Sequence, residues 1–147
     1  MTRLILLLGI GVAAGATIAL QSTINAALGR RAGNLGSVLI VTLVSIAFVS
    51  LLILLLPGEA KFGDLPKPQE WYLYLGGILG IMIVTAPVLL VPRIGATATL
   101  SAIVVGQLVT ALLIDQFGLF GQPRIEITLA RVVGLVLLLV GAFLLRP

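Results

Sequence analysis

The chain has 147 residues, of which 60% are hydrophobic and only 10% are charged, so it is far more apolar than a soluble domain of this length. It lacks cysteine and histidine, which excludes disulfides, thiol chemistry and the commonest metal ligands, and its five acidic residues lie apart in the sequence. We therefore expect an all-α integral membrane protein without a metal site or cofactor. The net charge of +4 is spread over predicted helix ends, which favours the lipid bilayer over nucleic acid as a partner.

The first predicted span covers residues 4–28, an apolar run longer than the corresponding region of a signal peptide. Thr17, Gln21 and Asn25 recur in it at every fourth residue, so they share one face of the helix. Such a face either forms permanent hydrogen bonds to another helix or lines a substrate cavity. Two carboxamides on one face exceed what packing requires, which favours the cavity.

The second predicted span covers residues 35–56 and follows a short basic turn over residues 29–34. It stops at Pro57, because proline cannot continue a helix. Residues 57–70 form the longest polar loop, and their mixed charges indicate a solvated connection.

The third predicted span covers residues 71–91 and begins with aromatic residues, which are typical of a membrane–water interface. Gly76 and Gly80 form a GxxxG pair, a pattern that favours close packing of helices in lipid. Pro87 lies inside this span and predicts a kink there.

The fourth predicted span covers residues 97–117 and follows a very short turn over residues 92–95. Small residues recur along one side of it, which predicts close contact with another helix. The members of this stripe that we assign to packing are Ala98, Ala102 and Gly106. Gln107 lies beside the stripe and near the middle of the span, where an unpaired amide is costly. We therefore expect Gln107 to face a polar cavity.

Asp115 is the only acidic residue inside a predicted span, which makes it a candidate functional group. It could carry a coupling proton, or it could act as a gate by pairing with an arginine. The alternative is an acidic residue at a helix end, placed at the interface.

The fifth predicted span covers residues 129–145, with Thr128 as its cap. It is apolar on all sides except for Arg131, which can extend to the interface. Gly134 and Gly141 are seven residues apart and share a face, which predicts helix packing, including contact across a dimer.

Five spans would place the termini on opposite sides of the membrane, and the basic residues are almost equally divided between those sides. The N-terminal side would hold Arg3, Lys61, Lys67, Arg124 and Arg131, and the opposite side Arg30, Arg31, Arg93 and Arg146. Orientation depends on Lys/Arg asymmetry, so this distribution specifies neither orientation. It favours insertion in both orientations and pairing as an antiparallel homodimer, which resembles the inverted repeats of transporters.

Three segments carry a resemblance to a known family: LQSTINAALGR at residues 20–30, LVPRIGATATLSAIVVGQL at 90–108 and LIDQFGLFG at 113–121. They resemble the DUF606, or YdcZ-like, family of the drug/metabolite transporter superfamily, and the similarity extends over nearly the whole chain. The resemblance implies a small multi-pass protein of the bacterial inner membrane with five helices. Some members are encoded as antiparallel pairs or fused ten-helix chains, and some are dual-topology homodimers. The small multidrug transporters of this superfamily carry an acidic residue in the first helix, and the first span here has none.

The sequence therefore favours a secondary transporter of a small polar or zwitterionic solute, working by alternating access. Its substrate site would be lined by Thr17, Gln21, Asn25 and Gln107. Asp115 would carry the coupling proton or act as a gate. A small ion channel and a structural subunit without transport are the alternatives. No nucleophile–base pair is visible, so an enzyme is not expected.

Overall fold

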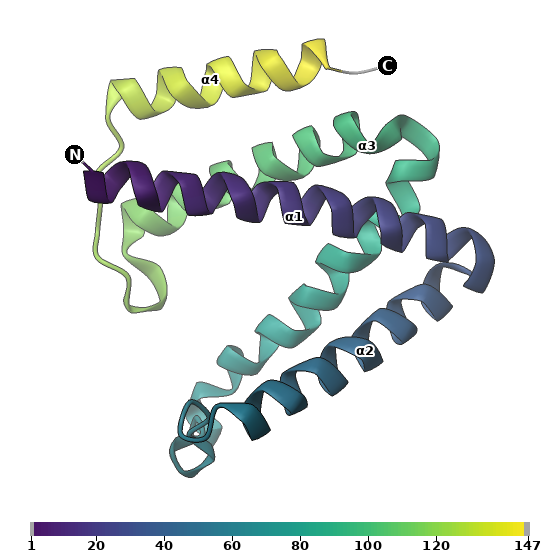
Figure 1. The fold of residues 1–147 in the computed structure, drawn as a ribbon. Helices are drawn as coiled ribbons and strands as arrows, with labels where there is room; N and C mark the ends of the chain where they lie inside the picture. The colour runs from purple at the N-terminus through teal and green to yellow at the C-terminus, as the bar shows by residue number, and fades with distance from the viewer. Residues whose placement is uncertain (1, 146–147) are drawn as a thin grey trace. The chain divides into compact units, whose positions relative to one another are not determined.

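The computed structural model describes residues 2–145, and all regular structure among these residues is helical. Its α-helices are α1 (Thr2–Ala32), α2 (Asn34–Leu55), α3 (Leu75–Phe117) and α4 (Leu129–Leu144), shown in Figure 1. Short 3-10 helices lie between them: η1 (Phe62–Asp64), η2 (Pro68–Tyr74) and η3 (Leu119–Gly121). The chain divides into two compact units, Met1–Leu89 and Leu90–Pro147. Arg146, one of the residues in the charge comparison, lies outside the described residues.

Three of the helical segments are long and apolar enough to cross a membrane, Leu4–Ala32, Asn34–Leu55 and Pro68–Phe117. The 22 residues of α2 rise about 33 Å, close to the hydrocarbon thickness of about 30 Å. The shorter apolar helix α4 has 16 residues and rises about 24 Å.

The predicted third and fourth spans are two parts of one element, α3, so the described residues form four α-helices rather than five. The 43 residues of α3 would rise about 65 Å if straight, roughly twice the hydrocarbon thickness. Gly95 interrupts the helix with φ 78° and ψ 163°, torsions that essentially only glycine adopts. The predicted turn over residues 92–95 is therefore reduced to this one residue. Pro87 keeps helical torsions, and the non-helical backbone lies at Gly95 instead.

The same backbone conformation separates α1 from α2. The predicted turn over residues 29–34 is wrong, because α1 continues to Ala32 and Gly33 alone forms the turn, with φ 76° and ψ 160°. Four residues beyond each of these glycines lies a fully buried residue with a hydroxyl group: Ser37 after Gly33 and Thr99 after Gly95. Thr99 donates to the carbonyl oxygen of Gly95 at 2.7 Å, and the Ser37 amide donates to that of Gly33 at 2.9 Å. The two turns thus share their glycine torsions, but the Ser37 hydroxyl donates to the carbonyl oxygen of Asn34 at 2.9 Å, whereas the Thr99 hydroxyl binds its glycine.

The α-helix of the third predicted span begins later than predicted, because its aromatic residues lie in a 3-10 helix. Trp71, Tyr72 and Tyr74 lie in η2, and α3 begins only at Leu75. Glu70 stabilises the start of η2, where its carboxylate accepts the Lys67 amide at 3.0 Å. All three aromatic side chains are exposed, as an interfacial position requires.

The interior of the first unit is small and partly polar. α1 and α2 meet at the Gly33 turn and separate away from it (Figure 1). A β-carbon at Gly29 would lie only 2.7 Å from Cγ1 of Val88, so α1 and the first part of α3 approach closely there. The buried residues of this unit are Ser22, Asn25, Ala26, Gly29, Ser37, Val38, Pro87 and Val88. The absence of a side chain at Gly29 therefore permits the backbone of α1 to approach the first part of α3.

The second unit contains the later part of α3, a returning loop and α4. The Thr128 cap is confirmed, because its hydroxyl accepts the Arg131 amide at 3.3 Å and its carbonyl accepts the Val132 amide at 3.1 Å. Hollows lie between the later part of α3 and α4, so these two helices are loosely packed along their length.

Candidate functional site

Hydroxyl side chains in the helices are mostly bound to their own helix. Thr17, a predicted site residue, donates to the carbonyl oxygen of Ala13 at 3.0 Å. The same i to i−4 bond is made by Thr23, Thr42, Ser45, Thr85 and Thr99. This arrangement satisfies a hydroxyl without a neighbouring helix, so Thr17 retains only acceptor capacity for a solute.

The carboxamides in the spans behave differently. Gln21 and Gln107 are exposed, Asn25 is buried with 6% of its surface accessible, and none of the three makes a side-chain hydrogen bond to another described residue. A carboxamide can donate two hydrogen bonds and accept two, so one bond to its own helix would leave most of this capacity unused. Gln21 and Gln107 therefore keep their full capacity for a partner outside the chain, whereas Asn25 is enclosed within the first unit.

The predicted polar face of α1 is divided between two environments. Asn25 lies in the interior of the first unit, whereas Thr17 and Gln21 lie on its surface. Gln107 belongs to the second unit. Ser22, which lies outside the predicted polar face, is buried beside Asn25 on α1 with 5% of its surface accessible. Its spacing of three residues from Asn25 is the signal that places both on one face.

The glycines predicted to pack have no neighbours in the described part of the chain. No atom lies within 4 Å of a β-carbon placed at Gly76, Gly80, Gly106, Gly134 or Gly141. Ala98 is half-buried and Ala102 is exposed, and both line a hollow of ≈ 490 Å³ beside α4. Gly29, which the small-residue patterns do not indicate, has the shortest such distance among the described glycines, 2.7 Å to Cγ1 of Val88. Packing across an assembly stays a prediction for the other positions.

Asp115 forms an ion pair with Arg131, with 2.5 Å between its Oδ2 and the arginine Nη2. The two side chains are 28% and 34% exposed, so the pair is partly shielded. Arg131 lies in the first turn of α4, and Asp115 in the last turns of α3, so the bond joins these helices at one end. Arg131 therefore contacts a partner within the chain instead of only extending to the interface.

The loop between α3 and α4 is bound back onto the end of α3. The carbonyl oxygen of Asp115 accepts the amides of Ile125 at 2.8 Å and Gly118 at 3.4 Å, and Oε1 of Gln116 accepts the amide of Ile127 at 2.7 Å. Gly118 adopts φ 60°, and a β-carbon there would lie 3.2 Å from the carbonyl oxygen of Gln122. The sequence DQFG, residues 115–118, thus builds the end of α3 and holds the returning loop.

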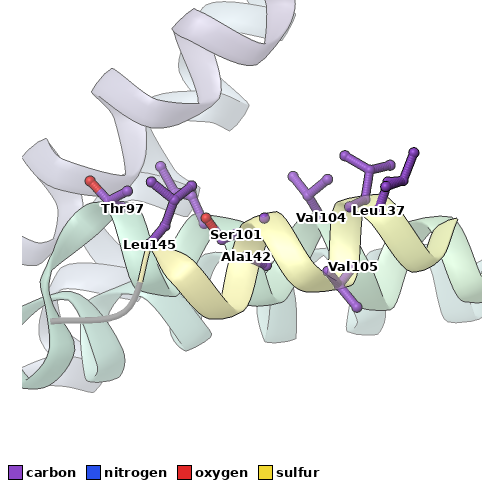
Figure 2. Close-up of a pocket in the computed structure, with 10 residues that line it drawn as sticks. Thr97, Ser101, Val104, Val105, Leu137, Ala142 and Leu145 are labelled. Atoms are coloured by element: carbon purple, nitrogen blue, oxygen red, sulfur yellow. The ribbon is translucent and has the colours of Figure 1, made fainter. Parts of the chain in front are cut away.

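The hollows between α3 and α4 are mostly apolar. One of them, ≈ 590 Å³, has Thr97 and Ser101 among its α3 residues and Leu137 and Ala142 among those of α4 (Figure 2). A smaller crevice of ≈ 270 Å³ lies at the Asp115–Arg131 end.

Comparison with known proteins relates the chain to proteins of the bacterial inner membrane. Residues 6–144 match a family model described as "Putative inner membrane exporter, YdcZ". The chain is 29% identical over 134 residues to a protein of Escherichia coli strain K12 named "Inner membrane protein YdcZ", and this covers 90% of the chain and 89% of that protein. No solved structure matches the chain. Because the family model spans nearly all of the apolar helices described above, the chain belongs to the YdcZ family and is a multi-pass protein of the inner membrane.

Proposed function

We propose that the chain exports a small polar or zwitterionic solute by alternating access, with five spans per chain and two chains in an antiparallel, dual-topology homodimer. The family description supports export in general terms. The observation that carries the finer proposal is the pair of unbonded carboxamides, Gln21 and Gln107, exposed within apolar helices.

An isolated chain in lipid would leave these two amides in hydrocarbon. Burying an amide without a hydrogen bond costs about 2–7 kcal/mol, depending on the reference state. Assembly with a second copy that encloses both residues in a polar cavity removes this cost. Such a cavity would offer donors and acceptors to a solute and to water in turn, as alternating access requires.

Within this proposal, Thr17, Gln21, Asn25 and Gln107 form the cavity wall, and Thr17 contributes as an acceptor. The Asp115–Arg131 ion pair supports a gating role for Asp115 more than a role as a free proton carrier. Breaking and re-forming that pair would change how the ends of α3 and α4 are joined.

The test compares Gln21→Leu and Gln107→Leu with Ser45→Ala, whose hydroxyl is bound to its own helix at Val41. Proteoliposomes are loaded with a mixture of amino acids and other small polar solutes, and mass spectrometry measures which solutes appear outside. The wild type should release at least one solute. Both glutamine variants should still dimerise but bind that solute more weakly, about tenfold for each 1.4 kcal/mol lost. Ser45→Ala should release it normally.

If the wild type releases no solute, the transport proposal fails. If both glutamine variants assemble and release the solute at the wild-type rate, the two residues are not part of the site. Loss of the dimer in Gln107→Leu would instead assign this glutamine to a permanent contact between helices.

A further inference from the structure

Arg131 has hydrogen-bonding capacity that the described chain does not use. Its Nη2 binds Asp115, whereas its Nη1 is buried and has no hydrogen-bond partner among the described residues. A buried, unpaired donor on a charged group is costly, and it is the one such side-chain atom found among these residues. A guanidinium group is planar and can bind a second carboxylate while keeping the first.

The position of Arg131 is well defined by its surroundings. Its backbone amide is held by the Thr128 hydroxyl, and its side chain is held by Asp115. It lies in the first turn of α4, where the helix dipole favours negative charge. An acidic group beside Nη1 would therefore find a preorganised donor.

Arg131 and Asp115 line the same crevice of ≈ 270 Å³. This volume lies just below the range of about 300–1,000 Å³ for pockets that hold drug-sized molecules, so it suits a solute of amino-acid size. The remaining lining is aliphatic or small: Leu108, Ala111, Leu112, Gly134, Leu135 and Leu138. The crevice thus combines one cation, one anion and an apolar wall.

We propose that this crevice binds a small aliphatic amino acid as a zwitterion. The solute carboxylate would bind Nη1 of Arg131, its ammonium group would bind Asp115, and its side chain would contact the leucines. A simple anion would be repelled by Asp115 and a simple cation by Arg131, so the pair selects a solute that carries both charges. This inference rests on the proposed export function and names the substrate class.

The test uses three probes of similar size: L-alanine, which carries both charges, propionate, which carries the anion, and L-alaninamide, which carries the cation. Each is added to the purified full chain in lipid nanodiscs, and the thermal unfolding midpoint is measured. A ligand that binds only the folded state raises this midpoint. The midpoint of the wild type should rise with L-alanine more than with either single-charge probe.

Arg131→Lys separates binding of the solute from the ion pair. Lysine keeps the positive charge beside Asp115 but lacks the second planar nitrogen, so the affinity for L-alanine should fall at least tenfold while the protein stays folded. Asp115→Asn should abolish the preference for L-alanine over propionate. Arg124→Lys changes an exposed arginine in the loop before α4, and it should leave binding of L-alanine unchanged.

Equal effects of the three probes on the wild type, or no effect of L-alanine at millimolar concentration, would overturn the proposal without any variant. Full affinity in a folded Arg131→Lys protein would also overturn it and leave the ion pair as a link between helices only. If L-alanine binds but is not released from proteoliposomes, the crevice is a binding site and the proposed export function is wrong. If another solute is released and L-alanine does not bind, the export function stands and this crevice is not its site.

Discussion

At the scale of single residues, Gly29 lies where α1 approaches the first part of α3 too closely for a larger side chain. Its position faces Val88, a stiff β-branched side chain that is itself 1% exposed and cannot easily move aside. In lipid, helices associate through van der Waals contact and hydrogen bonds, so a close approach of backbones contributes directly to stability.

We therefore expect Gly29→Ala to lower the free energy of unfolding by about 1–3 kcal/mol, the usual cost of forcing extra volume into a packed interior. Val88→Ala in the same chain should recover part of this loss, because it removes the atom that the new methyl group would meet. Unfolding in mixed micelles, followed by circular dichroism, measures both variants. Equal losses with and without Val88→Ala would show that this contact is not the cause.

At the scale of elements, Gly33 and Gly95 separate helices that would otherwise continue. Both have φ near 77° and ψ near 160°, torsions that are strained for every other residue. Without the interruption at Gly95, α3 would rise about 65 Å, too long for one crossing of a bilayer.

Gly95→Ala is expected to destabilise the protein by about 1–3 kcal/mol, because alanine cannot adopt these torsions without strain. Gly77→Ala is the matched control: its position lies in α3, it belongs to no predicted packing pair, and a β-carbon added there meets nothing within 4 Å, so this change should be neutral or stabilising by up to about 1 kcal/mol. Thermal unfolding of both variants in the same lipid checks this. A Gly95→Ala protein as stable as the wild type would show that the chain does not depend on this turn.

At the scale of the whole molecule, the nearly equal division of basic residues over five predicted spans predicts no preferred orientation. Arg30 and Arg31 lie in the last turn of α1, whereas Lys61 and Lys67 lie in the segment between α2 and α3. With five spans these pairs lie on opposite sides of the membrane, and a few added charges on one side should settle the orientation.

Reporter fusions at the C-terminus should be active on both sides of the membrane for the wild type. Adding Ala32→Lys and Asn34→Lys, at exposed positions beside the Gly33 turn, should hold that turn in the cytoplasm. Leu65→Lys and Gln69→Lys, exposed in the opposite loop, should produce the reverse orientation. A single orientation of the wild type would contradict the homodimer and favour a separate partner chain.

The sequence by itself determined that the chain is an all-helical membrane protein and that Thr128 caps its last helix. These features depend on local composition and on the period of a helix, so nearby residues are sufficient to predict them. The segment Leu20–Arg30 and the motif around Asp115 also carried the family resemblance that the family model confirmed.

Only the tertiary structure decided which residues meet. That Gly29 faces Val88, and that Asp115 pairs with Arg131, depends on segments far apart in the chain, which helical periodicity does not relate. Likewise, the sequence placed Gln21 and Asn25 on one face, but neighbouring helices cover Asn25 and leave Gln21 exposed. The positions of the turns were decided by single glycine torsions, because an apolar sequence in lipid favours helix until a residue such as Gly95 permits another conformation.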